Sequence, residues 1–394
     1  MTRSLKRYGY RLALGLLGVC LVEWVLSRAE AQEVRPGQGA AAVATVGPND
    51  PPNRAPYPGV ADRLANPNVW SRGARDDTPA LKAQLEGAKH NEVVRLGRRE
   101  YILTDTVTIR AHSAVFDSDG GTVVIWWKGP PDRWAFVFEG CNETVFGTKG
   151  KILILCDQDF PLWGGVLLRN TKEARPIPMS SCIFNRVTVE AVRPGGLRFA
   201  ALALDANGRP ANNDLHTFND FRGNAQAGGY AGFYSGQGNH ESHQVRFIGG
   251  GFNGFRFGHF WEEGQFISRE QNMGGNDVDF YVGSYHIANE IISVNSERSK
   301  RAIDGKAIPK GVGNLGGANL VVQTYRFGSF NALPDPVRWR SGAGILDLRN
   351  FQATHPIDKP AIFRSARPGG IVVDRLSERY GKVVEDAEVE PIKF

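Results

Sequence analysis

Two carboxylates in the second half of the chain have a spacing that suits glycoside hydrolysis. They are Asp277 and Asp279, within the alternating stretch 276–282. Alternation along a strand should turn Asp277, Asp279 and Tyr281 to one exposed face, with the carboxylates ~6.6 to 7 Å apart. Inverting glycosidases hold their acid and base ~6.5 to 9.5 Å apart. The pair is therefore a candidate hydrolytic site, and the alternative is a solvated strand face.

A second group of charged residues would suit β-elimination. A lyase needs a base that removes the proton beside a uronic acid carboxylate, and a cation that stabilises the resulting enolate. The candidates lie near strand ends and could share one groove if successive repeats stack: His243, Arg246, Arg269 and Glu270. Taken singly, each is also an ordinary surface charge.

Glycines and aromatic residues alternate between Gly223 and Gly275. Glycine allows tight turns with positive φ and phenylalanine fills a core, so this region suits the corners of a repeating β structure. The functional alternative makes exposed aromatic rings into platforms for the apolar faces of sugars. The candidates for that role are Tyr230, Tyr234 and Trp261.

The sequence carries no metal-binding signature. It has no EF-hand, no nonapeptide calcium repeat and no C-x-x-C pair. We assign no metal ligands and leave the cofactor open, with calcium considered only for a lyase. Past the N-terminal segment, Cys141, Cys156 and Cys182 stand in apolar contexts, where we expect thiols that are buried as small hydrophobic groups.

An amphipathic helix is predicted just after the acidic pair Asp76-Asp77. Thr78 can cap its free N–H groups, and Pro79 suits the first helical position. The apolar residues on one face of this helix, which should end near His90, are Leu81, Leu85 and Ala88. Short β-branched runs split by Gly, Asp and Ser follow, which is typical of strands joined by turns.

The stretch from Ser71 to Ile125 resembles the start of the pectate-lyase superfamily, secreted right-handed β-helix proteins that mostly act on polysaccharides. That family commonly opens with Gly-Asp-Gly-x-x-Asp-Asp-Thr, a helix, a strand, a Gly turn, a Tyr and a second strand. The matching positions are Gly73, Asp76, Asp77, Thr78, Gly97 and Tyr101, whereas Ser71 and Arg72 replace the usual Gly and Asp. The resemblance implies an all-β fold, a single right-handed parallel β-helix (solenoid) with a short N-terminal cap helix, in which the acidic pair is structural.

Beyond residue 140 the chain returns repeatedly to short strand-like runs with Asn or Gly nearby. Six residues taken as anchors of the repeat recur every 20 to 29 positions, an irregular period that suits a solenoid. These anchors are Phe221, Phe247, Ile267, Ile292, Val321 and Leu346. Stacked repeats lie ~4.8 Å apart, so Asn185, Asn219 and Asn295 are candidates for hydrogen-bonded ladders.

The N-terminus has the three-part layout of a secretory signal peptide: basic residues, an apolar run over 12–22 and a small-residue site at 29–31. We expect residues 1–31 to be the signal peptide, residues 32–60 a flexible linker rich in Pro, Gly and Ala, and residues 61–394 one β-helix domain. The apolar run is shorter than the ~20 residues of a membrane span. We therefore expect an exported protein (periplasmic, cell-surface or extracellular) with no stable membrane span after cleavage.

The formal net charge of +6 falls to about +3 when the five basic and two acidic residues of 1–31 are removed. This small excess gives no support to nucleic-acid binding, which needs a concentrated basic patch, while an acidic glycan could still be accepted. We expect a monomer that cleaves a cell-wall or extracellular polysaccharide by hydrolysis or β-elimination. The alternative is a non-catalytic glycan-binding or structural surface protein.

Overall fold

The computed structural model describes residues 76–97, 100–130, 132–156, 164–171, 177–191, 199–205, 213–236, 242–285, 289–305, 319–329, 332–340, 344–354, 361–366, 370–374 and 381–385. All of them belong to one compact unit, Thr45–Phe394. The expected signal peptide (1–31) and linker (32–60) lie outside the described residues.

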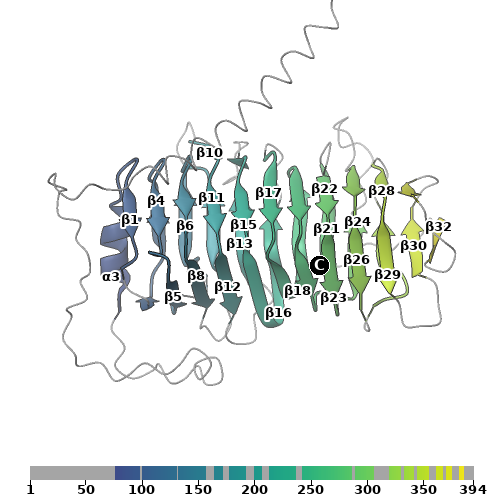
Figure 1. The fold of residues 1–394 in the computed structure, drawn as a ribbon, viewed down its shortest axis with the longest axis horizontal. Helices are drawn as coiled ribbons and strands as arrows, with labels where there is room; N and C mark the ends of the chain where they lie inside the picture. The colour runs from purple at the N-terminus through teal and green to yellow at the C-terminus, as the bar shows by residue number, and fades with distance from the viewer. Residues whose placement is uncertain are drawn as a thin grey trace, which may run out of the picture. The chain divides into compact units, whose positions relative to one another are not determined.

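Short strands make up most of the described chain, and the pairings between them are parallel (Figure 1). One sheet has 11 strands that follow one another in chain order: β1 (Val93–Arg95), β4 (Val115–Asp117), β7 (Val145–Phe146), β11 (Ile183–Asn185), β15 (Thr217–Asn219), β17 (Val245–Ile248), β19 (Phe266–Arg269), β22 (Asn289–Ile292), β25 (Leu320–Val322), β28 (Leu346–Leu348) and β31 (Ile371–Val373). The prediction of an all-β chain with parallel sheets is confirmed, and the architecture is consistent with a parallel β-helix.

A larger sheet gathers 19 strands: β2 (Glu100–Leu103), β3 (Val107–Ile109), β5 (Thr122–Trp127), β6 (Phe136–Glu139), β8 (Lys151–Cys156), β9 (Val166–Arg169), β12 (Val187–Ala191), β13 (Ala200–Asp205), β16 (Arg222–Ser235), β18 (Gly251–Glu263), β20 (Asn272–Gly274), β21 (Val278–Tyr285), β23 (Val294–Glu297), β24 (Arg301–Gly305), β26 (Tyr325–Gly328), β27 (Val337–Trp339), β29 (Phe351–Thr354), β30 (Ala361–Ser365) and β32 (Gly381–Glu385). A separate pair joins β10 (Met179–Ser180) to β14 (Asn213–Asp214).

The first described element is a short helical segment, α3 (Thr78–Leu81), continued by the π-helical turn η2 (Lys82–Glu86). Leu81 and Leu85 are fully buried, which confirms the predicted apolar face. Thr78 does not cap the helix: the N-cap residue is Asp77, and Thr78 Oγ1 accepts the backbone N–H of Thr104 at 2.7 Å.

The acidic pair at this end binds backbone and hydroxyl groups. Asp76 Oδ1 accepts the N–H of Thr78 at 2.9 Å, and its Oδ2 accepts the hydroxyl of Thr104 at 2.8 Å. Asp77 Oδ2 accepts the N–H of Ile102 at 3.0 Å. These bonds tie the helical segment to the first strands, which supports the structural interpretation of the pair.

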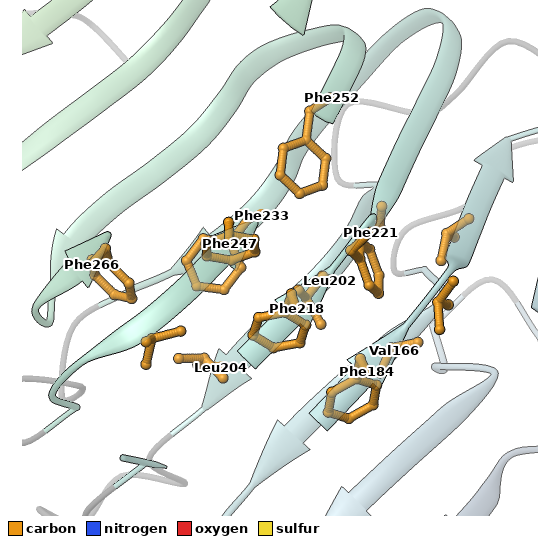
Figure 2. Close-up of a cluster of buried hydrophobic side chains, with 14 of the residues drawn as sticks. Val166, Phe184, Leu202, Leu204, Phe218, Phe221, Phe233, Phe247, Phe252 and Phe266 are labelled. Carbon is orange, nitrogen blue, oxygen red and sulfur yellow. The ribbon is translucent and has the colours of Figure 1, made fainter. Parts of the chain in front are cut away.

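Phenylalanines stack on one another through the core of the 11-strand sheet (Figure 2). The parallel register aligns Phe184, Phe218 and Phe247, whose ring centroids lie 5.1 and 4.9 Å apart in succession. The same register continues from Phe116 through these rings to Ser268. Because equivalent positions are only one strand apart, each buried ring covers the next.

The repeat is irregular, as the anchors predicted, and it is longer before the first anchor. Inward positions in the same register are separated by 21 residues from Phe247 to Ser268 and by 31 from Ile291 to Val322, but by 38 from Phe146 to Phe184. Phe247 is a true inward position, whereas Ile267 stands one residue before the inward Ser268 and faces outward. The anchor choice was wrong there because a short apolar run does not show which of its residues points inward.

Two further expectations about the core can be compared with the structure. Asn219 Nδ2 donates to Asn185 Oδ1 at 2.8 Å, so the ladder predicted for these two residues is confirmed. The cysteines Cys141, Cys156 and Cys182 are buried and free, as expected. The thiols thus pack in the core, whereas the Asn ladder is half-buried and lies on the side of the strands opposite the phenylalanines.

Candidate functional site

An open groove of about 640 Å³ lies across four strands of the 19-strand sheet, β16, β18, β20 and β23. Its polar lining consists of exposed or half-exposed side chains, which together we call the amide groove: Asn224, Asn253, Asn272, Asn295, Glu297 and Arg298. Each amide offers both a hydrogen-bond donor and an acceptor. The groove therefore presents many donors and acceptors side by side.

Two of the asparagines form a ladder that starts at Glu190. Asn224 Nδ2 donates to Glu190 Oε1 at 2.9 Å, and Asn253 Nδ2 donates to Asn224 Oδ1 at 3.2 Å. The backbone register places these three residues opposite one another on β12, β16 and β18. The ladder fixes the orientation of each amide, because a donor must face each acceptor.

The pleat of the strands decides which residues line the groove. Phe252 is fully buried and Met273 nearly so, and their neighbours Asn253 and Asn272 are exposed. Gly274 keeps space open beside the ladder, because a Cβ at this position would lie 2.8 Å from Asn253 Oδ1. A larger residue at position 274 would press against that amide.

The two carboxylates proposed for hydrolysis do not share an exposed face. The Asp277 side chain is 51% exposed and pairs with Lys300 at 2.7 Å, whereas Asp279 is completely buried. Tyr281, expected beside them at the surface, is also buried. The expectation is wrong because this strand does not alternate simply between core and solvent: Val278 and Tyr281 pack together in an aromatic cluster separate from the main core.

A network of neutral donors surrounds Asp279. Asn276 Nδ2 and Ser299 Oγ donate to its Oδ1 at 2.9 and 2.6 Å. Ser296 Oγ and Tyr325 Oη donate to its Oδ2 at 2.5 and 2.7 Å. Burial raises the pKa of Asp279, while these hydrogen bonds act in the opposite direction. A carboxyl group enclosed in this way is suited to joining strands, not to reaching a substrate.

The four lyase candidates do not converge. Arg246 and Arg269 are exposed on the neighbouring strands β17 and β19, two positions apart in register. His243 precedes β17 and Glu270 follows β19, which places them at opposite ends of these strands. His243 Nδ1 lies 3.4 Å from Asp214 Oδ1. The two arginines could contact one ligand, but the two candidate bases stand apart, because each flanks a different end of its strand.

Trp261 lies in the core, contrary to the expectation of an exposed platform. It is 2% exposed, its Nε1 donates to Nδ1 of His259 at 3.1 Å, and its ring stacks on Phe266 with centroids 5.3 Å apart. The expectation failed because β18 carries aromatic residues on both of its faces, so sequence alternation could not separate inward rings from outward ones.

Tyr230 and Tyr234 belong to the aromatic cluster outside the main core. Their ring centroids lie 5.9 Å apart, and Tyr234 stacks on Phe260, which stacks in turn on Tyr281. Both candidate tyrosines are half-buried. Burial raises the pKa of Tyr234 to about 12 and also raises that of Tyr230, so both hydroxyl groups stay protonated at neutral pH. Their role in sugar binding stays a prediction.

A group of ion pairs lies next to these stacked rings. Asp304 stands opposite Tyr281, is completely buried and accepts Nε of Arg340 at 3.1 Å. Arg301 connects it to a second carboxylate: its Nη1 lies 3.6 Å from Asp304 Oδ2, and its Nη2 lies 3.0 Å from Asp335 Oδ1. Burial raises the pKa of Asp304. Burial also acts on Asp335, but its arginine partners hold that pKa below the usual value. The two carboxylates and their arginines therefore form a buried ion-pair network.

The amide groove was not predicted from the sequence. Glycine-rich segments around it were noticed, and Asn295, which was predicted to join a structural ladder, stands opposite Asn272 in the register and lines the groove. The available signal was an outward Asn at the start of successive strands, as at Asn224, Asn253 and Asn272. That signal becomes readable only when the strand register is known.

Neither a metal cluster nor a membrane helix is found in the described parts of the chain. No three His, Cys, Asp or Glu side chains gather there in a way that could hold a metal ion. None of the helices described has the length and hydrophobicity that crossing a membrane requires.

No protein-family model matches the chain, and neither a curated protein nor a solved structure does.

Proposed function

We propose that this chain is an exported right-handed parallel β-helix protein, similar to the pectate-lyase superfamily, that binds an extracellular or cell-wall polysaccharide in the amide groove. The observation that carries the proposal is the ladder from Glu190 through Asn224 to Asn253, beside an open groove. Sugar hydroxyl groups both donate and accept hydrogen bonds, as amides do. A chain of sugars lying across successive strands would meet Asn224 and Asn253 on β16 and β18, and then Asn272 and Asn295 two register positions away on β20 and β23.

Two further features support a polymeric ligand. The groove is open, and it crosses four strands in a row. Neighbouring strands lie ~4.8 Å apart, so the amides on β16, β18 and β20 span roughly 10 Å. A ligand that contacts the amides on all three strands must extend at least that far.

Cleavage of the bound glycan is a second candidate function. Asp304 does not carry it, because this carboxyl group is completely buried, is paired with arginines and does not line the amide groove. Glu297 is the carboxylate that lines the groove, and its side chain is exposed. A carboxylate within reach of the ligand is what proton transfer in hydrolysis or β-elimination requires.

The test is a binding and cleavage assay on the full-length protein with a panel of neutral and acidic polysaccharides, with and without calcium. Asn253→Ala and Gly274→Val should weaken binding at least tenfold, because one removes an amide and the other fills the groove. Asn350→Ala, an exposed asparagine outside the groove, should bind as the wild type does.

The same assay separates binding from catalysis. New reducing ends together with the ultraviolet absorbance of unsaturated uronates would mean a lyase, and reducing ends alone would mean a hydrolase. Binding with neither signal would leave a glycan-binding protein. Equal affinity in the wild type and both groove variants, with all three proteins folded, would refute the assignment of the groove.

A further inference from the structure

A second pocket, of about 420 Å³, lies at the ends of three paired strands near the start of the chain. Arg110 follows β3, Glu139 ends β6 and Arg169 ends β9, and the register of these strands brings the three residues side by side. His112 and Thr171 complete its polar lining. None of these residues belongs to the amide groove.

The pocket is built around one carboxylate held by two arginines. Glu139 is 7% exposed at its side chain, and its Oε2 lies 2.8 Å from Nε and 2.6 Å from Nη2 of Arg110. Its Oε1 lies 3.0 Å from Nη2 of Arg169. Two guanidinium groups against one carboxylate leave the lining with one surplus positive charge. Asp205, which stands opposite Arg169 in the strand register, does not line the pocket.

Donors remain available after these ion pairs are made. Arg169 Nε is buried and has no hydrogen-bond partner among the described residues. An unpartnered buried donor is costly, so such groups call for an explanation. Thr171 Oγ1 accepts the N–H of Ile177 at 2.8 Å, which leaves its hydroxyl hydrogen free to donate. The side chain of Arg110 is 62% exposed, so a ligand can reach it from solvent.

We propose that this pocket is an oxyanion-binding site, in which Arg110 and Arg169 donate to a carboxylate, sulfate or phosphate group. Arginine forms strong, directional hydrogen bonds to these groups because its planar donors match their oxygens. His112 adds no charge at neutral pH, since burial and the neighbouring His90 lower its pKa. This proposal does not depend on polysaccharide binding, because the two arginines would attract any oxyanion of suitable size.

Calorimetric titration of the full-length protein tests the site at constant ionic strength. The probes are sodium sulfate, inorganic phosphate and galacturonate, with galactose as the neutral comparison. We expect saturable binding of at least one oxyanion, weakened tenfold or more by Arg110→Gln. The matched control is Arg349→Gln. The side chain of Arg349 is also exposed (54%) and forms an ion pair with Asp347 on the 11-strand sheet. This variant should leave oxyanion binding unchanged.

The possible results separate the sources of the ligand. Galacturonate binding without phosphate or sulfate binding would identify an acidic sugar, and the reverse would identify a free inorganic anion. Either result supports the site if Arg110→Gln weakens the binding of that ligand, and neither result depends on the amide groove. Wild-type affinity in Arg110→Gln, or no oxyanion binding at all, would overturn the proposal. Arg110 is exposed and Glu139 keeps its bond to Arg169, so this variant should fold.

Discussion

Tyr325 donates its hydroxyl to Asp279 Oδ2 at 2.7 Å, joining residues 46 positions apart in the chain inside a fully buried network. The bond connects a strand of one repeat to a strand of a later one. Burial raises the pKa values of both groups, and the hydrogen bonds that Asp279 accepts act against that shift. Asp279 is therefore a structural residue that ties repeats together, although its spacing from Asp277 had indicated chemistry.

Replacing Asp279 should separate its hydrogen-bonding role from its charge. In Asp279→Ala, the donors from Asn276 and Tyr325 lose their acceptor in the core. Unsatisfied buried donors cost about 1–3 kcal/mol each, so we expect a loss of at least about 3 kcal/mol in the free energy of unfolding. Asp279→Asn keeps an acceptor oxygen and the size of the side chain, so its loss should be at most about 1 kcal/mol, measured by chemical denaturation. Equal losses in the two variants would contradict this account.

The pH dependence of Asp279→Asn gives a second readout of the same residue. The folded-state pKa is raised above the usual value of 3.8, so the stability from protonated Asp279 is complete below 3.8 and is lost as the pH rises through the folded pKa. Asp279→Asn cannot titrate. Its stability relative to the wild type should therefore increase as the pH rises from 3.8 toward neutrality.

A buried histidine should make the protein less stable in acid. Nε2 of His259 contacts Gln271 Oε1 at 2.7 Å, and its Nδ1 accepts the indole N–H of Trp261. Both nitrogens are therefore satisfied in the neutral ring, and burial lowers the pKa of His259 to about 3. The unfolded chain, with a pKa near 6.5, takes up a proton first as the pH falls.

The free energy of unfolding should thus fall between pH 6.5 and pH 3, by up to about 1.4 kcal/mol per pH unit from this residue. His216, which burial shifts in the same way, should add a similar slope. Denaturation of His259→Phe at pH 7, 6, 5 and 4 checks the assignment, because this variant should lose one of the two contributions. An unchanged slope would mean that His259 is accessible to protons in the folded state.

The sequence predicted the fold correctly where short-range patterns determine the structure. Leu81 and Leu85 follow a helical period and are buried. The Asn185–Asn219 ladder was also predicted, because an Asn at the end of a short strand is well placed to meet its equivalent in the next repeat. These features depend on short-range spacing and on the assumption that repeats stack in parallel.

The candidate site was harder to predict from the sequence, because it depends on which face of each strand points inward. Asp279 and Trp261 were expected outside and are buried, since polar networks and aromatic residues occupy both faces of these strands. The groove required knowing that Asn224 lies opposite Asn253. That register follows from repeat lengths that vary between strands, and one sequence does not reveal it.

The stack of phenylalanines should carry much of the stability of the core. Phe218 lies between Phe184 and Phe247, with ring centroids 5.1 and 4.9 Å away (Figure 2). Removing it leaves a cavity between two rings, so Phe218→Ala should lower the free energy of unfolding by about 3–5 kcal/mol. Ile248→Ala is the control, since Ile248 lies nearby at the surface with 37% exposure and should cost less than about 1 kcal/mol. Similar losses in both variants would show that the stack relaxes around the missing ring.

The buried cysteines should report on opening of the core. Burial raises the pKa of Cys182 to about 12 and raises that of Cys141 well above its usual value, so almost no reactive thiolate is present at pH 8. We expect Cys141, Cys156 and Cys182 to stay unmodified by a thiol reagent in native buffer and to react fully in denaturant, as peptide mass spectrometry can measure residue by residue. Phe218→Ala should speed the labelling of Cys182 more than Ile248→Ala does, because a weakened core opens more often. Fast labelling of Cys182 in the native wild type would instead place that thiol in contact with solvent.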